Sequence, residues 1–163
     1  MAIIKPNNNT LSAITALPAG VGGKVLQVVS TNKTSLFSTN STSYVDVTGL
    51  SVSITPSSTS NKIFIITTPN INISDEASNF YLDSYVYLLR NSTGIAESRG
   101  AVNTGNTSLA DNFQNSCISY LDTPNTTSSI TYKIQTKCSS SNFTVRWCRD
   151  SFSSTITAYE IAG

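Results

Sequence analysis

Short runs of alternating apolar and polar residues recur along the chain, and the most regular of them spans residues 45–54. Its apolar positions are Val45 and Val47, followed by Leu50, Val52 and Ile54. Successive side chains of a strand point to opposite faces, so this run predicts a β-strand with one buried face. The alternation changes phase at Thr48–Gly49, where glycine tolerates an unusual backbone conformation. We therefore expect all five apolar side chains to point inward, with a β-bulge or a corner between sheets at residues 48–49.

Further strand-like runs follow one another, separated by turn residues such as Ser, Asn and Gly. They cover residues 24–30, 62–68, 71–73, 79–90, 113–123, 128–138, 142–148 and 154–162. The first run is almost wholly apolar, which predicts burial on both faces, and Pro69 predicts a bulge or an edge kink. The tract 91–112 is rich in loop residues and holds at most one short strand. Eight or nine short strands without an amphipathic helix predict an all-β antiparallel sandwich, and a jelly roll over residues 24–163 fits best.

The composition favours strands and excludes several classes of function. The 163 residues include 27 Ser, 22 Thr and 16 Asn, and only 12% of the chain is charged. Ser, Thr and Asn offer the backbone hydrogen bonds that compete with helix, while the recurring apolar residues argue against disorder. The 10 basic and 9 acidic residues are spread along the chain, which argues against a nucleic-acid or lipid-headgroup surface. The chain also lacks the apolar stretches of a membrane span or a signal peptide, so we expect neither membrane insertion nor signal-directed secretion.

Residues 1–23 differ from the rest of the chain. They contain two small apolar clusters, and then Pro18 and three glycines. The clusters consist of Ile3 and Ile4, and of Leu11, Ile14 and Leu17. The segment is too short to be a domain, so it is either a frayed terminus or an attachment arm joined by a flexible hinge. We expect an arm that docks on another protein through these five apolar side chains.

The chain carries no recognisable catalytic or metal-binding motif. It contains no histidine, which removes the Ser–His–Asp and Cys–His arrangements. Its cysteines lack the paired spacing of a zinc site, and it has no phosphate-binding glycine loop. Asp75, Glu76 and Asp83 are either a calcium or glycosidase-type carboxylate group or ordinary solvated residues, and the ordinary case is the more common one. We expect a protein that is not an enzyme and that needs no cofactor or metal.

Trp147 and the cysteines are the remaining side chains with possible chemistry. Trp147 alternates with Phe143 and Val145, so it is either a core residue or a platform on which a sugar ligand stacks. An odd number of cysteines without a signal peptide predicts reduced thiols. Cys138 and Cys148 fall on opposite faces of the expected hairpin, which argues against a disulfide between them.

The last strand-like run carries apolar residues at both parities, so both of its faces require cover. It is either a central strand under a loop or part of a subunit interface near a threefold axis. Closed symmetry would bury sheet edges that a small sandwich leaves exposed. We take Ile156, Tyr159 and Ile161 as candidate contacts between the subunits of a homotrimer.

Three blocks of the sequence resemble a known family. They are VDVTGLSVSITPSS (45–58), YLDTPNTTSSITYK (120–133) and STITAYEI (154–161). In this order they resemble the tail-fibre-like virion proteins of bacteriophages, especially phages of cyanobacteria and other marine bacteria, and the similarity extends from residue 20 to the end. The resemblance implies a compact jelly roll of the trimeric type seen in tumour-necrosis-factor and C1q-like heads. Family members often carry long amino-terminal shafts, whereas here only residues 1–23 precede the domain, so we expect a knob on an arm.

The expected function is that of a structural virion protein, made in the host cytoplasm. It would be a trimeric knob or short tail fibre whose arm docks on the tail or baseplate and whose loops contact the host surface, with a surface glycan as one candidate partner. A head decoration protein, with the arm clamped across capsid subunits, is the alternative. A free carbohydrate-binding lectin would need ligand-stacking aromatic residues in loops, whereas most aromatic residues here lie within the strand-like runs.

Overall fold

A computed structural model describes residues 24–75, 81–103 and 112–163. These residues form twelve β-strands and one short 3-10 helix, η1 (Arg149–Ser151). The prediction of an all-β protein is therefore confirmed. The division of the chain at residue 23 stays a prediction, because residues 1–23 lie outside the described residues.

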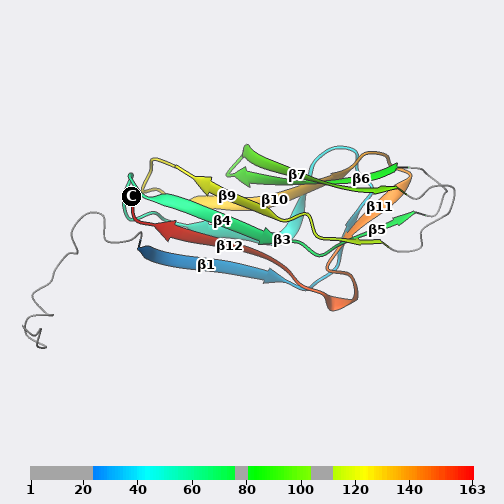
Figure 1. The fold of residues 1–163 in the computed structure, drawn as a ribbon, viewed down its shortest axis with the longest axis horizontal. Helices are drawn as coiled ribbons and strands as arrows, with labels where there is room; N and C mark the ends of the chain where they lie inside the picture. The colour runs from blue at the N-terminus through cyan, green and yellow to red at the C-terminus, as the bar shows by residue number, and fades with distance from the viewer. Residues whose placement is uncertain (1–23, 76–80, 104–111) are drawn as a thin grey trace, which may run out of the picture.

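Eight of the strands form two antiparallel sheets of four, which pack as the layers of a sandwich (Figure 1). The first sheet has the order β1 (Val25–Lys33), β12 (Ser154–Ile161), β4 (Lys62–Thr68), β9 (Ile118–Asp122). The second has the order β3 (Val45–Ile54), β10 (Ile130–Cys138), β6 (Tyr81–Arg90), β7 (Thr93–Asn103). Counted along the chain, these eight strands lie in the orders 1-8-3-6 and 2-7-4-5. This is the order of a jelly roll, so the predicted fold is confirmed.

The other four strands form a third sheet, which we call the tip sheet. Its order is β2 (Phe37–Thr39), β11 (Phe143–Trp147), β5 (Ile71–Asp75), β8 (Asn112–Gln114). Each of these strands is the chain neighbour of the first-sheet strand in the same position, so the tip sheet repeats the order of the first sheet. Figure 1 shows β5 and β11 at the end of the molecule opposite the carboxyl terminus.

A line of breaks separates the tip sheet from the first sheet. The breaks fall at residues 34–36, 69–70, 115–117 and 148–153. Pro69 lies in one of them, between β4 and β5, where its missing N–H group cannot donate to a neighbouring strand. Hydrogen bonds still cross this line, because Cys148 N donates to Asn70 O at 3.1 Å and Asn70 N donates to Ser154 Oγ at 2.8 Å.

Strand β3 contains the irregularity that the sequence predicts. Gly49 has a φ of +82°, and the register with β10 shifts between the pairs Ser51–Lys133 and Asp46–Gln135. Of the five apolar side chains, Val47, Leu50, Val52 and Ile54 are buried and Val45 is partly buried. The phase change is thus a bulge that keeps one face of β3 inward, and the strand stays within one sheet instead of turning a corner.

The core fills the space between the two main sheets and continues under the tip sheet. Its largest fully buried side chains are Trp147, Tyr132, Leu50, Ile54, Ile63, Ile65, Ile71, Ile73, Leu82, Leu88, Ile130 and Ile134. Most of them alternate with polar residues along their strands, as on β10, where every second residue from Ile130 to Cys138 is buried. The burial of one face of each strand is what fixes its register.

Four details of the sequence prediction were wrong. The strand count was low, because the short tip strands were not expected as separate elements. The tract 91–112 contains the long strand β7, whose polar sequence is ordered by pairing with β6 along its length. Residues 24–30 are not buried on both faces, because Val25 and Val28 lie on the outward face of the first sheet and are each 52% exposed. Cys148 is buried like Cys138, because its left-handed backbone (φ 57°) breaks the strand alternation.

Candidate functional site

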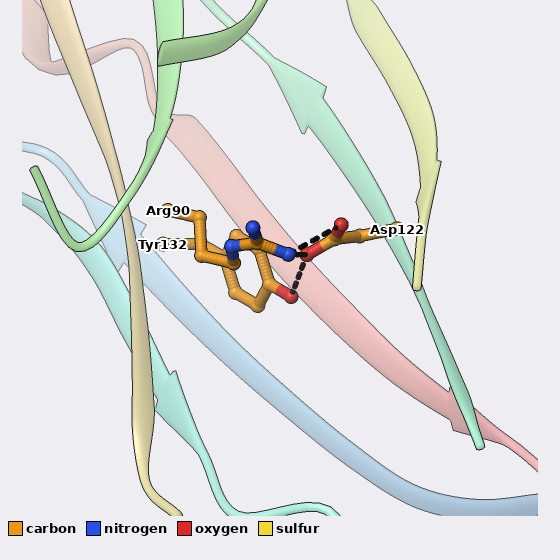
Figure 2. Close-up of polar contacts among 3 residues, drawn as sticks. All are labelled: Arg90, Asp122 and Tyr132. Atoms are coloured by element: carbon orange, nitrogen blue, oxygen red, sulfur yellow. Dashed lines mark hydrogen bonds and ion pairs between the residues drawn. The ribbon is translucent and has the colours of Figure 1, made fainter. Parts of the chain in front are cut away.

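A buried carboxylate between the two sheets belongs to Asp122, at the end of β9. Its side chain is 7% exposed and forms an ion pair with Arg90, whose Nη1 lies 2.9 Å from Oδ1. The hydroxyl of Tyr132 donates to Oδ2 of the same carboxylate at 2.7 Å. Figure 2 shows Arg90 and Tyr132 approaching Asp122 from the same side. Because Asp122 belongs to the first sheet and its two partners to the second, the network joins the two layers.

The chemistry of this network is structural. Burial and the hydrogen bond to Asp122 raise the pKa of Tyr132, so its phenol stays protonated and acts as a hydrogen-bond donor. Arg90 neutralises the carboxylate, and both carboxylate oxygens are occupied. No acid or base in the group is left to exchange protons with a substrate, so we assign it to sheet packing.

A second buried carboxylate, Glu160 on β12, organises the loop between β3 and β4. Its Oε1 accepts hydrogen bonds from Ser57 N (2.6 Å), Ser57 Oγ (2.7 Å) and Asn61 Nδ2 (2.6 Å). Burial disfavours the ionised form, but the hydrogen bonds from Asn61 and Ser57 outweigh it and hold the pKa of Glu160 below its usual value. Asn61 Oδ1 in turn accepts from Gly163 N at 3.2 Å, so the carboxyl terminus is tied to the same loop.

The carboxylates that the sequence offers as a calcium or glycosidase group are not brought together in the described residues. Asp83 on β6 forms an ion pair with Arg99 Nη2 at 2.6 Å. The side chains of Asp75 and Glu76 lie outside what the structure describes. Across the described residues, no three His, Cys, Asp or Glu side chains cluster closely enough to hold a metal ion.

Trp147 is a core residue. Its exposed fraction is 0%, and it packs in the same cluster as Phe143 and Val145. A ring without exposed surface cannot stack on a sugar, so the ligand-contact hypothesis for Trp147 is not supported by its position. Two half-exposed aromatic rings, Phe113 and Phe152, meet edge to face at 6.1 Å near the break line. Nothing in the sequence links these two residues, because they are far apart in the chain.

The structure separates the three candidate interface residues of β12 by parity. Ile156 points into the core and is 0% exposed, so it has no surface to offer another subunit. Tyr159 and Ile161 lie on the opposite, outward side of the strand and are partly exposed. Tyr159 also contacts Phe64 on β4, with a ring-centroid distance of 6.1 Å. Only these two candidates therefore remain available for contact between subunits.

Strand β1 adds residues to this surface. Val25 and Val28 are each 52% exposed and Leu26 is 40% exposed, although they belong to one of the most apolar runs of the chain. Val25 lies opposite Ile161 and Val28 opposite Tyr159 in the ladder with β12. The apolar character of this run was visible in the sequence, but its position at the sheet edge was not. The arm residues Ile3, Ile4, Leu11, Ile14 and Leu17 lie outside the described residues.

No protein-family model matches the chain, and no curated protein matches it either. Solved structures that the chain resembles include the VP2 subviral particle of infectious bursal disease virus, at 15% identity and a TM-score of 0.39, covering 84% of this chain and 38% of that chain. Particles of T=1 symmetry derived from the same virus give 14% identity and a TM-score of 0.41, covering 82% of this chain and 35% of that chain. The chain therefore spans little more than a third of these solved chains. At such low identity and TM-score, the fold assignment rests on the strand order of the chain itself. Among the described residues, no helix has the length and apolar character needed to cross a membrane.

Proposed function

We propose that this protein is a non-enzymatic structural component of a bacteriophage virion. In this proposal it forms a homotrimeric knob or short tail fibre on the particle surface. The arm, residues 1–23, docks on other tail or baseplate proteins through its apolar side chains. The loops of the sandwich face outward toward the host surface, where a glycan is the candidate partner.

The observation that carries the proposal is the open apolar strand β1. Monomeric sandwich proteins in water usually have polar or charged edge strands, because the unpaired backbone groups of an exposed apolar edge can pair with other chains. Here the edge strand exposes Val25, Leu26 and Val28. An apolar edge of this kind is suited to a protein that is buried in an assembly. The sequence resemblance to tail-fibre-like virion proteins supplies the kind of assembly.

Antibody labelling of purified phage particles tests the proposal directly. We expect the label on the tail, and its absence from particles would overturn the virion role. Native mass spectrometry should give a species of roughly three times 17.4 kDa. Deletion of residues 2–17 should abolish incorporation into particles while the sandwich still folds, and unchanged incorporation would refute the docking role of the arm.

A head decoration protein is the second candidate. An apolar edge beside a short apolar arm also suits a protein clamped across capsid subunits. The labelling experiment separates the two candidates, because a label on the head would replace the tail assignment and leave the structural role intact.

A further inference from the structure

One end of the outward face of the first sheet is apolar across all four strands, while the other end carries Ser and Thr side chains. In the ladders, Val28 lies opposite Tyr159, Tyr159 opposite Phe64, and Phe64 opposite Leu121. We call this surface the outer apolar face, and it consists of Val25, Val28, Phe64, Ile66, Leu121, Tyr159 and Ile161. Val25, Val28 and Leu121 are about half exposed, at 52%, 52% and 50%, and the other four are partly exposed. The row from Val28 to Leu121 therefore crosses all four strands without an interruption by a charged side chain.

Charge is almost absent from this face. Among the outward residues of β1, β12, β4 and β9, all of which the structure describes, Lys62 at the border is the one charged side chain. The two carboxylates of these strands, Asp122 and Glu160, both point inward and are buried. A sheet with one solvated face normally places polar residues outward, as the other end of this face does with Ser30, Thr157 and Thr68, so the outer apolar face departs from the pattern of a surface that stays in water.

The outward face of the second sheet shows the opposite character. Asp46 on β3 accepts hydrogen bonds from Lys133 Nζ at 2.9 Å and from Gln135 Nε2 at 2.7 Å, both on β10. The ammonium group of Lys137 lies over the rings of Tyr44 and Tyr85, at 4.5 and 4.7 Å from their centroids. These charges find partners within the face and keep contact with water, so this sheet needs no further cover.

From this contrast we infer that the outer apolar face is the surface by which one copy of this chain binds a second copy, while the charged face of the other sheet stays in solvent. The inference rests on the proposed function, because it names the surface through which that assembly forms. It adds Val28, Phe64, Ile66 and Leu121 to Tyr159 and Ile161 as contact residues.

The identity of the partner follows from charge and shape. A homotrimer brings the face of one copy against a different surface of the next copy, and a face with almost no charge can enter such a contact without repulsion between like charges. A sheet face packs well on another surface of similar breadth, because side chains interdigitate across several strands at once. The competing occupant is the arm, residues 1–23, which joins β1 at a corner of this face. An extended segment would follow a narrow groove more readily than a surface four strands wide.

The test introduces a charge on each outward face of the full-length chain. The variants Leu121→Lys and Tyr159→Lys place a lysine on the outer apolar face. The matched control Ser53→Lys places one on the outward face of β3 in the second sheet. Sedimentation velocity at micromolar concentration measures self-association, and circular dichroism with thermal unfolding confirms the fold of each variant. We expect the wild type and Ser53→Lys to self-associate and the other two variants to be folded monomers.

Three results would overturn the inference. A wild-type chain that is monomeric under these conditions would do so, and so would a folded Leu121→Lys or Tyr159→Lys variant that associates like the wild type. Deletion of residues 2–17 gives the third result. If the truncated chain is a folded monomer, self-association depends on the arm and not on contact with the sandwich of a second copy. Particle labelling separates failure of this interface inference from failure of the proposed virion role. A label on particles supports the virion role whichever surface the protein uses to associate.

Discussion

Nη1 of Arg90 lies 2.9 Å from Oδ1 and 3.1 Å from Oδ2 of Asp122, so one nitrogen of the second sheet binds both carboxylate oxygens of a first-sheet residue. This contact and the hydroxyl of Tyr132 join the two layers of the jelly roll by polar bonds in a region otherwise held by apolar packing. The geometry satisfies the buried carboxylate, which would otherwise destabilise the sandwich.

Replacement of this carboxylate should destabilise the fold. Asp122→Asn removes the charge that Arg90 faces and should lower the free energy of unfolding by about 1–3 kcal/mol. The control is Asp46→Asn, which breaks the exposed pair with Lys133 and should cost only about 0–1 kcal/mol. Urea denaturation of both variants checks the comparison. An equal decrease in unfolding free energy for the two variants would contradict the prediction that the buried Asp122 network contributes more to stability than the exposed pair.

The thiols should differ sharply in reactivity. Cys117 is exposed, whereas Cys138 and Cys148 are each 1% exposed, and all three are free. Burial raises the pKa of the Cys138 thiol to about 11, which leaves it protonated near neutral pH. Iodoacetamide should therefore label one thiol quickly in the native protein and all three after denaturation, as counted by mass spectrometry. In Cys117→Ser the fast phase should vanish, and a persisting fast phase would contradict the assigned burial.

Glu160 should make stability depend on acidity. Its folded pKa lies below its usual value, so its contribution is complete above the unfolded pKa of about 4.3 and is lost as the pH falls through the lower folded pKa. Glu160→Gln cannot ionise and should lack this dependence. We expect the wild type to exceed the variant in unfolding free energy at pH 7 and to lose that advantage in acid. A difference between the two proteins that stays constant with pH would contradict the prediction.

The bulge in β3 should tolerate asparagine better than alanine. Gly49 has a φ of +82°, and a Cβ there would meet nothing closer than Lys33 Nζ at 4.0 Å. The cost of Gly49→Ala therefore comes from the backbone alone and should be about 1–2 kcal/mol. Gly49→Asn should cost less, because asparagine enters the left-handed region more readily. Chemical denaturation gives both values, and the reverse order would rule out the backbone explanation.

The single tryptophan should report folding and remain silent toward sugars. Trp147 is fully buried, so its fluorescence should be blue-shifted in the native protein and resist quenching by acrylamide until the protein unfolds. Addition of glycans should leave the emission unchanged. Efficient quenching in the native state would place the ring at the surface and reopen its assignment as a ligand contact.

The sequence predicted the strands whose one face is buried. On β3 and β10 the alternation of apolar and polar residues is visible in the chain and matches the buried and exposed positions, and even the phase change at Gly49 corresponds to a bulge. Strand β7 escaped prediction because its residues are mostly small or polar, and its order comes from pairing with β6. Periodicity cannot reveal a strand whose stability lies in its partner.

The candidate interface was predictable only in part. Residues of both parities on β12 are apolar, because this central strand has the core on one side and the outer apolar face on the other. The sequence could not say which parity lay inward, so Ile156 was grouped with Tyr159 and Ile161. Phe64 and Leu121 were not linked to them at all, because only the ladders β12–β4 and β4–β9 bring these residues into one row.

The line of breaks between the first sheet and the tip sheet has a consequence for how this protein can diversify. Insertions or register changes in the tip strands need not propagate into β1, β12, β4 or β9, because each ladder ends before the tip begins. The tip sheet and the outer apolar face are therefore separately mutable. A lineage of such proteins could exchange tips while keeping a common mode of assembly.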